Sequence, residues 1–505
     1  MKRLFSILTA TALALVLALP ARTASETVDS SMAPSGMALV GDTLYVADTY
    51  HRAVWTVEDG EASLLAGRTE ITDLSGRPVE GYNDGTFAQA AFSEPWAIVP
   101  YDDGFLVSDT GNHVLRYLNM DKERVYTAAG TGRAGLRDDT GEKASFDSPT
   151  GLAVDNEGTV YIADTGNNVI RCMDEDGNVT TYAGGEEGCA LGSLQTVRFS
   201  QPTGLCWADG VLYVADTGNH RIVALEGNQA VLAAGAELTG DAAYEGDFLN
   251  GTADTARFSS PQGIAVGQDG AVYIADTGNG AVRVLKDGYV TTLLEREDNG
   301  TYPVSPRGLL VNGDTLYVGD VFSRVLLRSD ARVEGISFLD VREDSWYAPA
   351  VYFAAANSLF TGTGDGLFSP DAPMTRAMVL TVLARYDGVN TAGGDSWYAA
   401  GLQWGLDTGV SDGTSPMSPI TREQLAVMLY RYVQYRGVDV SGAWMYALEY
   451  ADAGAVSDYA YEAMCWMNAR GIITGVGDNR LAPQGTATRA QVAAILMRCL
   501  SYGGE

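Results

Sequence analysis

The chain is poor in histidine and in positive charge. It has three His in 505 residues, and 33 Lys and Arg stand against 64 Asp and Glu, giving a formal net charge of −31. Nucleic-acid binding depends on a basic face that releases counterions, so nucleic acid is excluded as an expected partner. The charge balance indicates instead a protein that works outside the cell.

Cysteines are also few. The chain contains Cys172, Cys189, Cys206, Cys465 and Cys499. No two are separated by two residues, so a zinc knuckle is not predicted, and the odd count leaves at least one thiol outside any disulfide within the chain. A Cys465–Cys499 disulfide stays open if their helices are antiparallel neighbours, but buried free thiols are the favoured interpretation.

Only the N-terminus carries a long apolar run. Met1-Lys2-Arg3 precedes the apolar stretch 4–19, which is typical of a secretory signal peptide and places one over residues 1–25. A retained membrane anchor is the weaker alternative because the run is short for a span. No later segment is apolar for long enough, so we expect an exported protein without a membrane span after signal cleavage.

Repetition dominates the first two-thirds of the sequence. The word Asp-Thr-Gly-Asn occurs at 109–112, 164–167, 216–219 and 276–279, and degenerate copies begin at Asp48 and Asp320. A proline stands 14 or 15 residues before each of these six Asp residues. Such regular spacing indicates a repeat architecture.

Each repeat reads as four short antiparallel strands. In the third copy the strand-like stretches are 151–155, 159–164, 169–173 and 178–182, separated by Gly, Asp and Asn turns. Six such units predict an all-β six-bladed propeller over residues 30–336. Asp and Asn bond their own backbone in tight turns, so the repeated word is interpreted as scaffold.

The segment Tyr213–Ile222 resembles the NHL repeat, and the resemblance covers about residues 30–330. It implies that the fourth-to-first strand connections and the second-to-third turns share one face, usually the binding face. The long connections at 67–92, 132–146, 184–199 and 235–258 are therefore where we expect a ligand, whether protein, peptide or glycan, to bind.

The NHL resemblance also raises an enzymatic alternative. The family includes lyases and hydrolases whose channel metal is held by His, and the candidates here are His51, His113 and His220. All three fall in the same kind of turn, which favours a structural role, and no Gly-x-Ser-x-Gly motif occurs. We assign no catalytic residue and no cofactor; structural calcium stays open, and zinc is expected only if the enzyme interpretation holds.

A different repeat begins near residue 338. Thr-Arg recurs at Thr375, Thr421 and Thr488, each Arg six residues after a proline. These features resemble the S-layer homology module, with copies at 338–390, 391–440 and 448–502. The resemblance implies an all-α, three-pronged bundle, so the whole chain is predicted to be multidomain.

The S-layer homology resemblance implies grooves for secondary cell-wall polysaccharide, which often carries pyruvate ketals. An Arg fork suits a carboxylate and an aromatic ring suits a sugar, although each aromatic residue could equally be core. The candidate polysaccharide-binding residues are Asp340, Trp346, Arg376, Trp397, Arg422, Asp452, Tyr459 and Arg489. Fewer than three grooves are expected to be competent, with Arg376 and Arg489 favoured over Arg422.

These resemblances predict a protein held non-covalently on the cell wall of a bacterium of the Gram-positive type, by polysaccharide and not by lipid. The propeller would serve as a binding platform. A wall-anchored, metal-dependent lyase or hydrolase is the alternative, and a structural component of an S-layer is a further one.

Overall fold

The computed structural model describes residues 26–29, 31–236, 246–296, 303–332, 338–342, 344–364, 366–391, 396–442 and 447–502. The chain divides into two compact units, an all-β unit that ends before residue 336 and a helical unit that follows it. The expected signal peptide lies outside the described residues.

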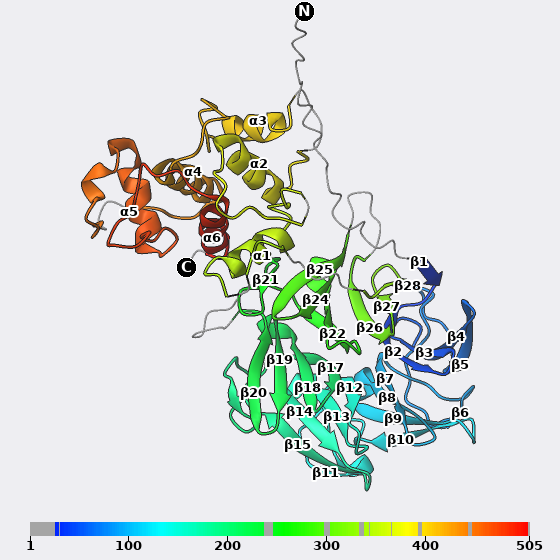
Figure 1. The fold of residues 1–505 in the computed structure, drawn as a ribbon. Helices are drawn as coiled ribbons and strands as arrows, with labels where there is room; N and C mark the ends of the chain where they lie inside the picture. The colour runs from blue at the N-terminus through cyan, green and yellow to red at the C-terminus, as the bar shows by residue number, and fades with distance from the viewer. Residues whose placement is uncertain are drawn as a thin grey trace, which may run out of the picture. The chain divides into compact units, whose positions relative to one another are not determined.

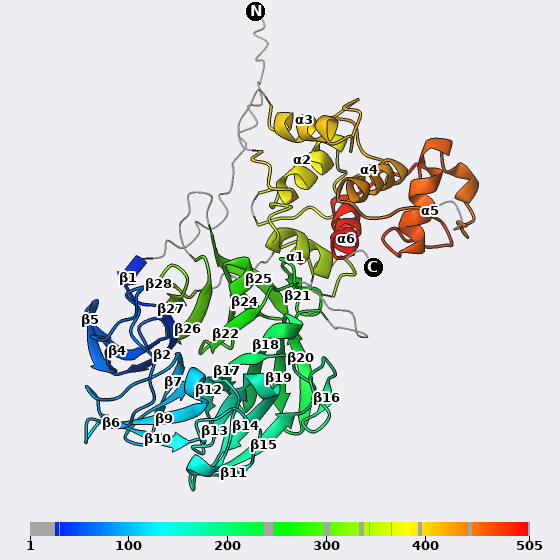
Figure 2. The ribbon, with the colours of Figure 1, turned by 180° about the vertical axis from the view of Figure 1, so that it is seen from behind.

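The β unit is a ring of six antiparallel sheets, or blades (Figure 1, Figure 2). Blade 1 contains β2 (Pro34–Val40), β3 (Thr43–Asp48), β4 (Ala53–Glu58) and β5 (Glu61–Ala66). Blade 2 contains β7 (Pro95–Tyr101), β8 (Gly104–Asp109), β9 (Val114–Asn119) and β10 (Arg124–Ala129). Blade 3 contains β12 (Pro149–Val154), β13 (Val160–Asp164), β14 (Val169–Met173) and β15 (Asn178–Gly184). Blade 4 contains β17 (Pro202–Ala208), β18 (Val211–Asp216), β19 (Arg221–Glu226) and β20 (Gln229–Ala234). Blade 5 contains β22 (Pro261–Val266), β23 (Val272–Asp276), β24 (Ala281–Lys286) and β25 (Tyr289–Glu295).

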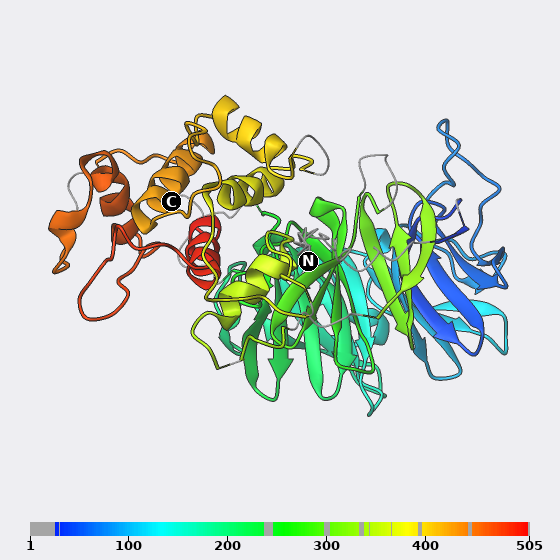
Figure 3. The ribbon, with the colours of Figure 1, turned by 45° about the horizontal axis from the view of Figure 1, so that its top comes forward.

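Blade 6 is closed by the start of the chain. It contains β26 (Pro306–Asn312), β27 (Thr315–Asp320) and β28 (Val325–Asp330), and its outer strand is β1 (Glu26–Asp29), which pairs antiparallel with β28. The prediction that every repeat supplies its own four strands is therefore wrong for the sixth copy. Figure 3 shows the blue strands of blade 1 beside the yellow-green strands of blade 6, where the ring closes.

The innermost strands explain why a glycine stands two residues after the leading proline in five of the six repeats. The first strand of each blade packs against that of the next, from β2 round to β26 and back to β2. A Cβ on Gly151 would lie 2.1 Å from the Thr203 carbonyl oxygen of the next blade, and one on Gly204 would lie 2.0 Å from the Gln262 oxygen. Only glycine permits this approach.

The long connections between blades are partly ordered as edge strands. Within the described residues, four of them contain a two-residue strand that pairs with the outer strand of the blade that follows it in the chain. These are β6 (Gly85–Thr86), β11 (Asp139–Thr140), β16 (Gly192–Ser193) and β21 (Gly251–Thr252). They cover edges that would otherwise expose unpaired backbone groups, so the connections are not free loops along their whole length.

Within its described residues, the helical unit contains three pairs of α-helices. The helices are α1 (Ala348–Ala356), α2 (Arg376–Tyr386), α3 (Ala399–Asp407), α4 (Arg422–Tyr435), α5 (Tyr461–Ala469) and α6 (Arg489–Leu500). The helices that pack together are α1 with α6, α2 with α3, and α4 with α5. Each pair thus joins two different modules, and Figures 1 and 2 both show α6 in red beside α1. None of the helices in the described ranges is long and apolar enough to cross a membrane.

The three modules interlock in a closed cycle. The backbone N–H of Ala377 in module 1 donates to the Pro416 carbonyl of module 2 at 2.8 Å. Module 2 makes the same bond to Pro483 of module 3, and Ala490 of module 3 returns it to Pro370 of module 1, both at 3.0 Å. These contacts give the position six residues before each Arg a structural role, because its carbonyl satisfies a free N–H group at the start of a helix in another module.

The cysteines of the helical unit are buried and free. Cys465 lies on α5 and Cys499 on α6, and the two thiols form no disulfide. Burial raises the pKa of Cys499 to about 12, so this thiol is unreactive at neutral pH.

Candidate functional sites

The repeated Asp anchors a buried network in each blade. In blade 3 the Asp164 carboxylate accepts bonds from the Asp147 backbone N–H at 2.7 Å, from Asn167 Nδ2 at 2.9 Å and from Arg171 Nη1 at 2.9 Å. Asp164 and Arg171 are both fully buried. Burial raises the pKa of Asp164 to about 6, against the lowering effects of Asn167, the Asp147 N–H and Arg171. The carboxylate is a structural group, as the sequence predicted for the repeated word.

The repeated Thr joins each of the first five blades to the next. Thr165 donates its hydroxyl to the Pro202 carbonyl at 2.7 Å, and Thr217 donates to Pro261 at the same distance. The corresponding bonds are made by Thr49, Thr110 and Thr277. The repeated word therefore serves two purposes, since its Asp organises its own blade and its Thr links the blades.

Sequence reasoning missed the buried arginines that complete this network. Arg116, Arg171 and Arg283 stand seven residues after their Asp, and Arg221 stands five after Asp216. Arg171 also lies over the Phe146 ring, 5.3 Å from its centroid. The sequence signal that could have identified them is an Arg that recurs in the third strand of blades 2 to 5.

The three histidines hold backbone turns in separate blades. His113 Nδ1 accepts the Ser148 N–H at 2.9 Å, and His220 Nδ1 accepts the Ser260 N–H at 2.8 Å. Both residues adopt left-handed backbone conformations at the end of their turns. His51 Nδ1 lies 2.6 Å from an Asp48 carboxylate oxygen. Over the part of the chain that the structure describes, no group of three or more His, Cys, Asp or Glu is placed to hold a metal ion.

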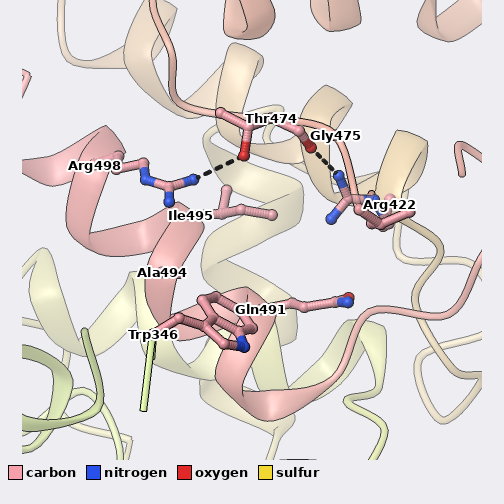
Figure 4. A pocket seen from close by; sticks show the side chains of 9 residues that line it. Trp346, Arg422, Thr474, Gly475, Gln491, Ala494, Ile495 and Arg498 are labelled. Atoms are coloured by element: carbon pink, nitrogen blue, oxygen red, sulfur yellow. Dashed lines mark hydrogen bonds between the residues drawn. The ribbon is translucent and has the colours of Figure 1, made fainter. Parts of the chain in front are cut away.

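A pocket of about 360 Å³ forms where all three modules of the helical unit meet (Figure 4). Module 1 contributes Trp346, module 2 contributes Arg422, and module 3 contributes Gln491 and Arg498 of α6 together with residues 474–476. We call this the Trp346 pocket. It brings together two of the residues predicted to bind polysaccharide, Trp346 and Arg422, although Arg422 was the less favoured arginine.

Two guanidinium groups line the Trp346 pocket. Arg422 is 4% exposed and donates Nε to the Leu481 carbonyl at 2.9 Å and Nη2 to the Thr474 carbonyl at 2.6 Å. Burial lowers the pKa of Arg422, which remains a cation. Arg498 Nη1 makes only long contacts, at 3.4 Å to Thr474 Oγ1 and 3.5 Å to the Ile472 carbonyl. The described residues that line the pocket include no Asp or Glu.

A second pocket, also of about 360 Å³, is likewise lined by residues of all three modules but differs in charge. Module 1 contributes Arg376, module 2 contributes Asp412 and Arg431, and module 3 contributes Tyr459. We call it the Tyr459 pocket. Arg376 Nη2 donates to the Asp412 carboxylate at 2.7 Å, so one of its two cations is already neutralised. Backbone bonding from Thr414, with Arg376 as a smaller cause, lowers the pKa of Asp412.

The remaining predicted residues lie elsewhere in the helical unit. Arg489 is buried and donates Nε to the Phe368 carbonyl at 2.7 Å and Nη2 to the Thr361 carbonyl at 2.9 Å. The Asp340 carboxylate accepts two backbone N–H groups of the loop that follows α1, and the Asp452 carboxylate accepts two from the loop after α5. Trp397 is 48% exposed and lines neither pocket. Their roles in polysaccharide binding stay predictions.

Comparison with known proteins identifies both repeats. The model of the NHL repeat matches residues 146–173, 199–225 and 258–285, and that of the S-layer homology domain matches 337–377 and 449–493. The chain is 28% identical over 286 residues to the protein SUPPRESSOR OF QUENCHING 1, chloroplastic, of Arabidopsis thaliana, covering 52% of this chain and 26% of that protein. It is 28% identical over 290 residues to NHL repeat-containing protein 2 of Bos taurus, covering 50% and 38%.

The chain thus spans well under half the length of these curated relatives. Among solved structures, a structural genomics protein of unknown function from Bacteroides thetaiotaomicron aligns with a TM-score of 0.44 and 16% identity, covering 61% of this chain and 72% of that one. The fold and the family matches together define the class: the chain joins a six-bladed NHL-repeat propeller to S-layer homology domains. Such domains imply association with a bacterial cell surface, and the propeller implies an interaction platform.

Proposed function

We propose that the helical unit anchors this protein non-covalently to an acidic secondary cell-wall polysaccharide, through the Trp346 pocket, while the propeller presents a ligand-binding face. The wall is of the Gram-positive type, and the acidic group on the polymer is a carboxylate such as that of a pyruvate ketal. The observation that carries the proposal is the pairing of two guanidinium groups with an exposed indole in a pocket lined by no acid among its described residues.

The charge of this pocket supports an anionic ligand. The chain as a whole carries a formal charge of −31, so a pocket with two cations and no acidic lining residue is a local exception. An anion bound there gains charge-assisted hydrogen bonds that the protein itself leaves incomplete, above all at Arg498. Sulfate or phosphate would pair only with the guanidinium groups, whereas an acidic sugar would also pack its ring against the Trp346 indole.

The shape of the pocket supports a saccharide. The Trp346 side chain is 65% exposed and lies across the pocket from residues 474–475 (Figure 4). An indole presents a flat apolar face to the C–H groups of a sugar ring. Gln491 adds an amide that can donate and accept hydrogen bonds to hydroxyl groups.

The test compares matched arginines in the two pockets. Arg498→Gln in the Trp346 pocket should weaken binding of the purified wall polymer to the full chain by about 10- to 100-fold, because a hydrogen bond to a charged group contributes about 1.5–3 kcal/mol. Arg431→Gln, the corresponding change in the Tyr459 pocket, is the control and should change affinity by less than about threefold. Equal loss in the two variants, at unchanged thermal unfolding, would contradict the assignment to the Trp346 pocket.

A further inference from the structure

A further cationic group, Arg307, lies at the start of the first strand of blade 6, on the inner side of the propeller ring. The residue after the leading proline is Trp96 on β7, Gln262 on β22 and Arg307 on β26. Each leading proline pairs with the Asp at the start of an Asp-x-x-x turn, for example Pro95 with Asp109. These three residues therefore lie one residue away from the face of the ring that carries the Asp-x-x-x turns.

Arg307 reaches across the ring. Its guanidinium carbon lies 4.0 Å from the centroid of the Trp96 ring, and its Nε donates to Gln262 Oε1 at 2.8 Å. Gln262 belongs to the adjacent blade 5, but Trp96 belongs to blade 2, which is separated from blade 6 by blade 1. The guanidinium is therefore held over the mouth of the ring by two side chains from different blades.

No carboxylate forms an ion pair with Arg307 in the described part of the propeller, although the charge of Glu94 acts on it. Within the described part of the propeller no carboxylate lies within 4 Å of it, and the bond to Gln262 is the only hydrogen bond that its side chain makes there. The four N–H donors of its two Nη groups are left over. The fully buried arginines of the propeller, such as Arg171, pair with a buried Asp. Burial lowers the pKa of Arg307 to about 10, which still leaves it charged at neutral pH.

We propose that the mouth of the propeller ring is a carboxylate-binding subsite in which the Nη groups of Arg307 receive the anion and Trp96 and Gln262 hold the guanidinium in place. A planar fork with two free Nη groups matches the two oxygens of a carboxylate. Glu94, whose charge acts on Arg307, repels a doubly charged phosphate more strongly than a singly charged carboxylate at the same place. The ligand class is thus a singly charged acid, and we take it to be a uronic acid.

This subsite deepens the proposed role of the propeller as a binding platform. It does not involve the wall polymer or either pocket of the helical unit, so the two proposals can fail separately. The readout must be local, because a soluble acidic sugar could also enter the Trp346 pocket.

The experiment uses the full chain labelled with 5-fluorotryptophan, with the Trp96 fluorine resonance assigned through Trp96→Phe. Titration with D-galacturonate should shift the Trp96 resonance saturably, and the neutral sugar D-galactose should not. Arg307→Gln should weaken the response at least tenfold. Gln262→Glu should do the same while keeping the arginine, because it places a competing carboxylate beside Nε. Arg324→Gln is the matched control, since Arg324 is exposed and stacks on Tyr50 at 4.7 Å.

Arg324→Gln should leave the titration unchanged. The proposal is overturned if galactose shifts the Trp96 resonance as strongly as galacturonate, if Arg307→Gln titrates like the parent protein, or if Arg324→Gln loses as much affinity as Arg307→Gln. The last result would indicate a diffuse effect of surface charge and not a subsite.

Discussion

Removal of Arg171 from its buried ion pair should strongly destabilise the propeller. Arg171 and Asp164 are both 0% exposed and lie 2.9 Å apart. Arg171 also donates to the carbonyls of Ser145 and Arg137, at 2.9 and 3.0 Å. Arg171→Leu leaves a buried carboxylate without its cation and removes the guanidinium donor from the Ser145 and Arg137 carbonyls, which keep only their backbone N–H donors. Breaking one side of a buried pair costs about 3–5 kcal/mol, and this is the loss we expect.

A surface arginine of the same blade supplies the control. Arg137 pairs with Asp139, but its side chain is 63% exposed. Arg137→Leu should cost less than about 1 kcal/mol because solvent screens an exposed ion pair. The comparison separates the effect of burial from the loss of one Arg.

The assay is denaturant titration followed by hydrogen exchange and mass spectrometry of peptides from β12–β15. Reading one blade matters because a chain with two units need not unfold in a single step. A double variant, Asp164→Asn with Arg171→Leu, should lose less than the sum of its single changes. A loss for Arg171→Leu no greater than that for Arg137→Leu would refute the structural role of the network.

Three further predictions concern other contacts. Thr217→Val removes the bond to the Pro261 carbonyl and should cost the propeller about 1–2 kcal/mol in denaturant titration, whereas an unchanged midpoint would exclude the link between blades. Burial raises the pKa of Glu423, but hydrogen bonds from Ser457 and Tyr459 outweigh this effect and hold the pKa below its usual value of 4.5. The ionised carboxylate therefore stabilises the fold above that pH, and this contribution is lost as the pH falls. Acid unfolding of Glu423→Gln, followed by circular dichroism, should therefore depend less steeply on pH; an unaltered profile contradicts this. Asp412→Gly frees Arg376 and should let the Tyr459 pocket bind acidic sugar, which calorimetry would register as a second site.

The sequence was sufficient to predict the six-bladed architecture because each repeat corresponds to one blade. Regular spacing of Pro, Gly and Asp follows from contacts made again in every blade, so the number of blades could be counted. The strand β1 could not be predicted, because residues 26–29 resemble no repeat and are defined by their partner β28. The buried arginines were missed since Arg is expected at the surface unless its partner is known.

The candidate site was harder to predict than the fold. Trp346, Arg422 and Arg498 belong to three different modules, and only the cyclic exchange of helices and loops brings them together. The sequence of one module does not indicate that its arginine lines a pocket formed with the other modules. The difference between the two pockets depends on Asp412, whose partner Arg376 is 36 residues away in the sequence.

Co-sedimentation of the full chain with purified bacterial walls tests the central claim most directly. The protein should pellet with walls that carry their secondary polysaccharide, remain in the supernatant once that polymer is stripped, and be released from intact walls by the free polymer. Equal binding to intact and stripped walls would contradict anchoring through the polysaccharide.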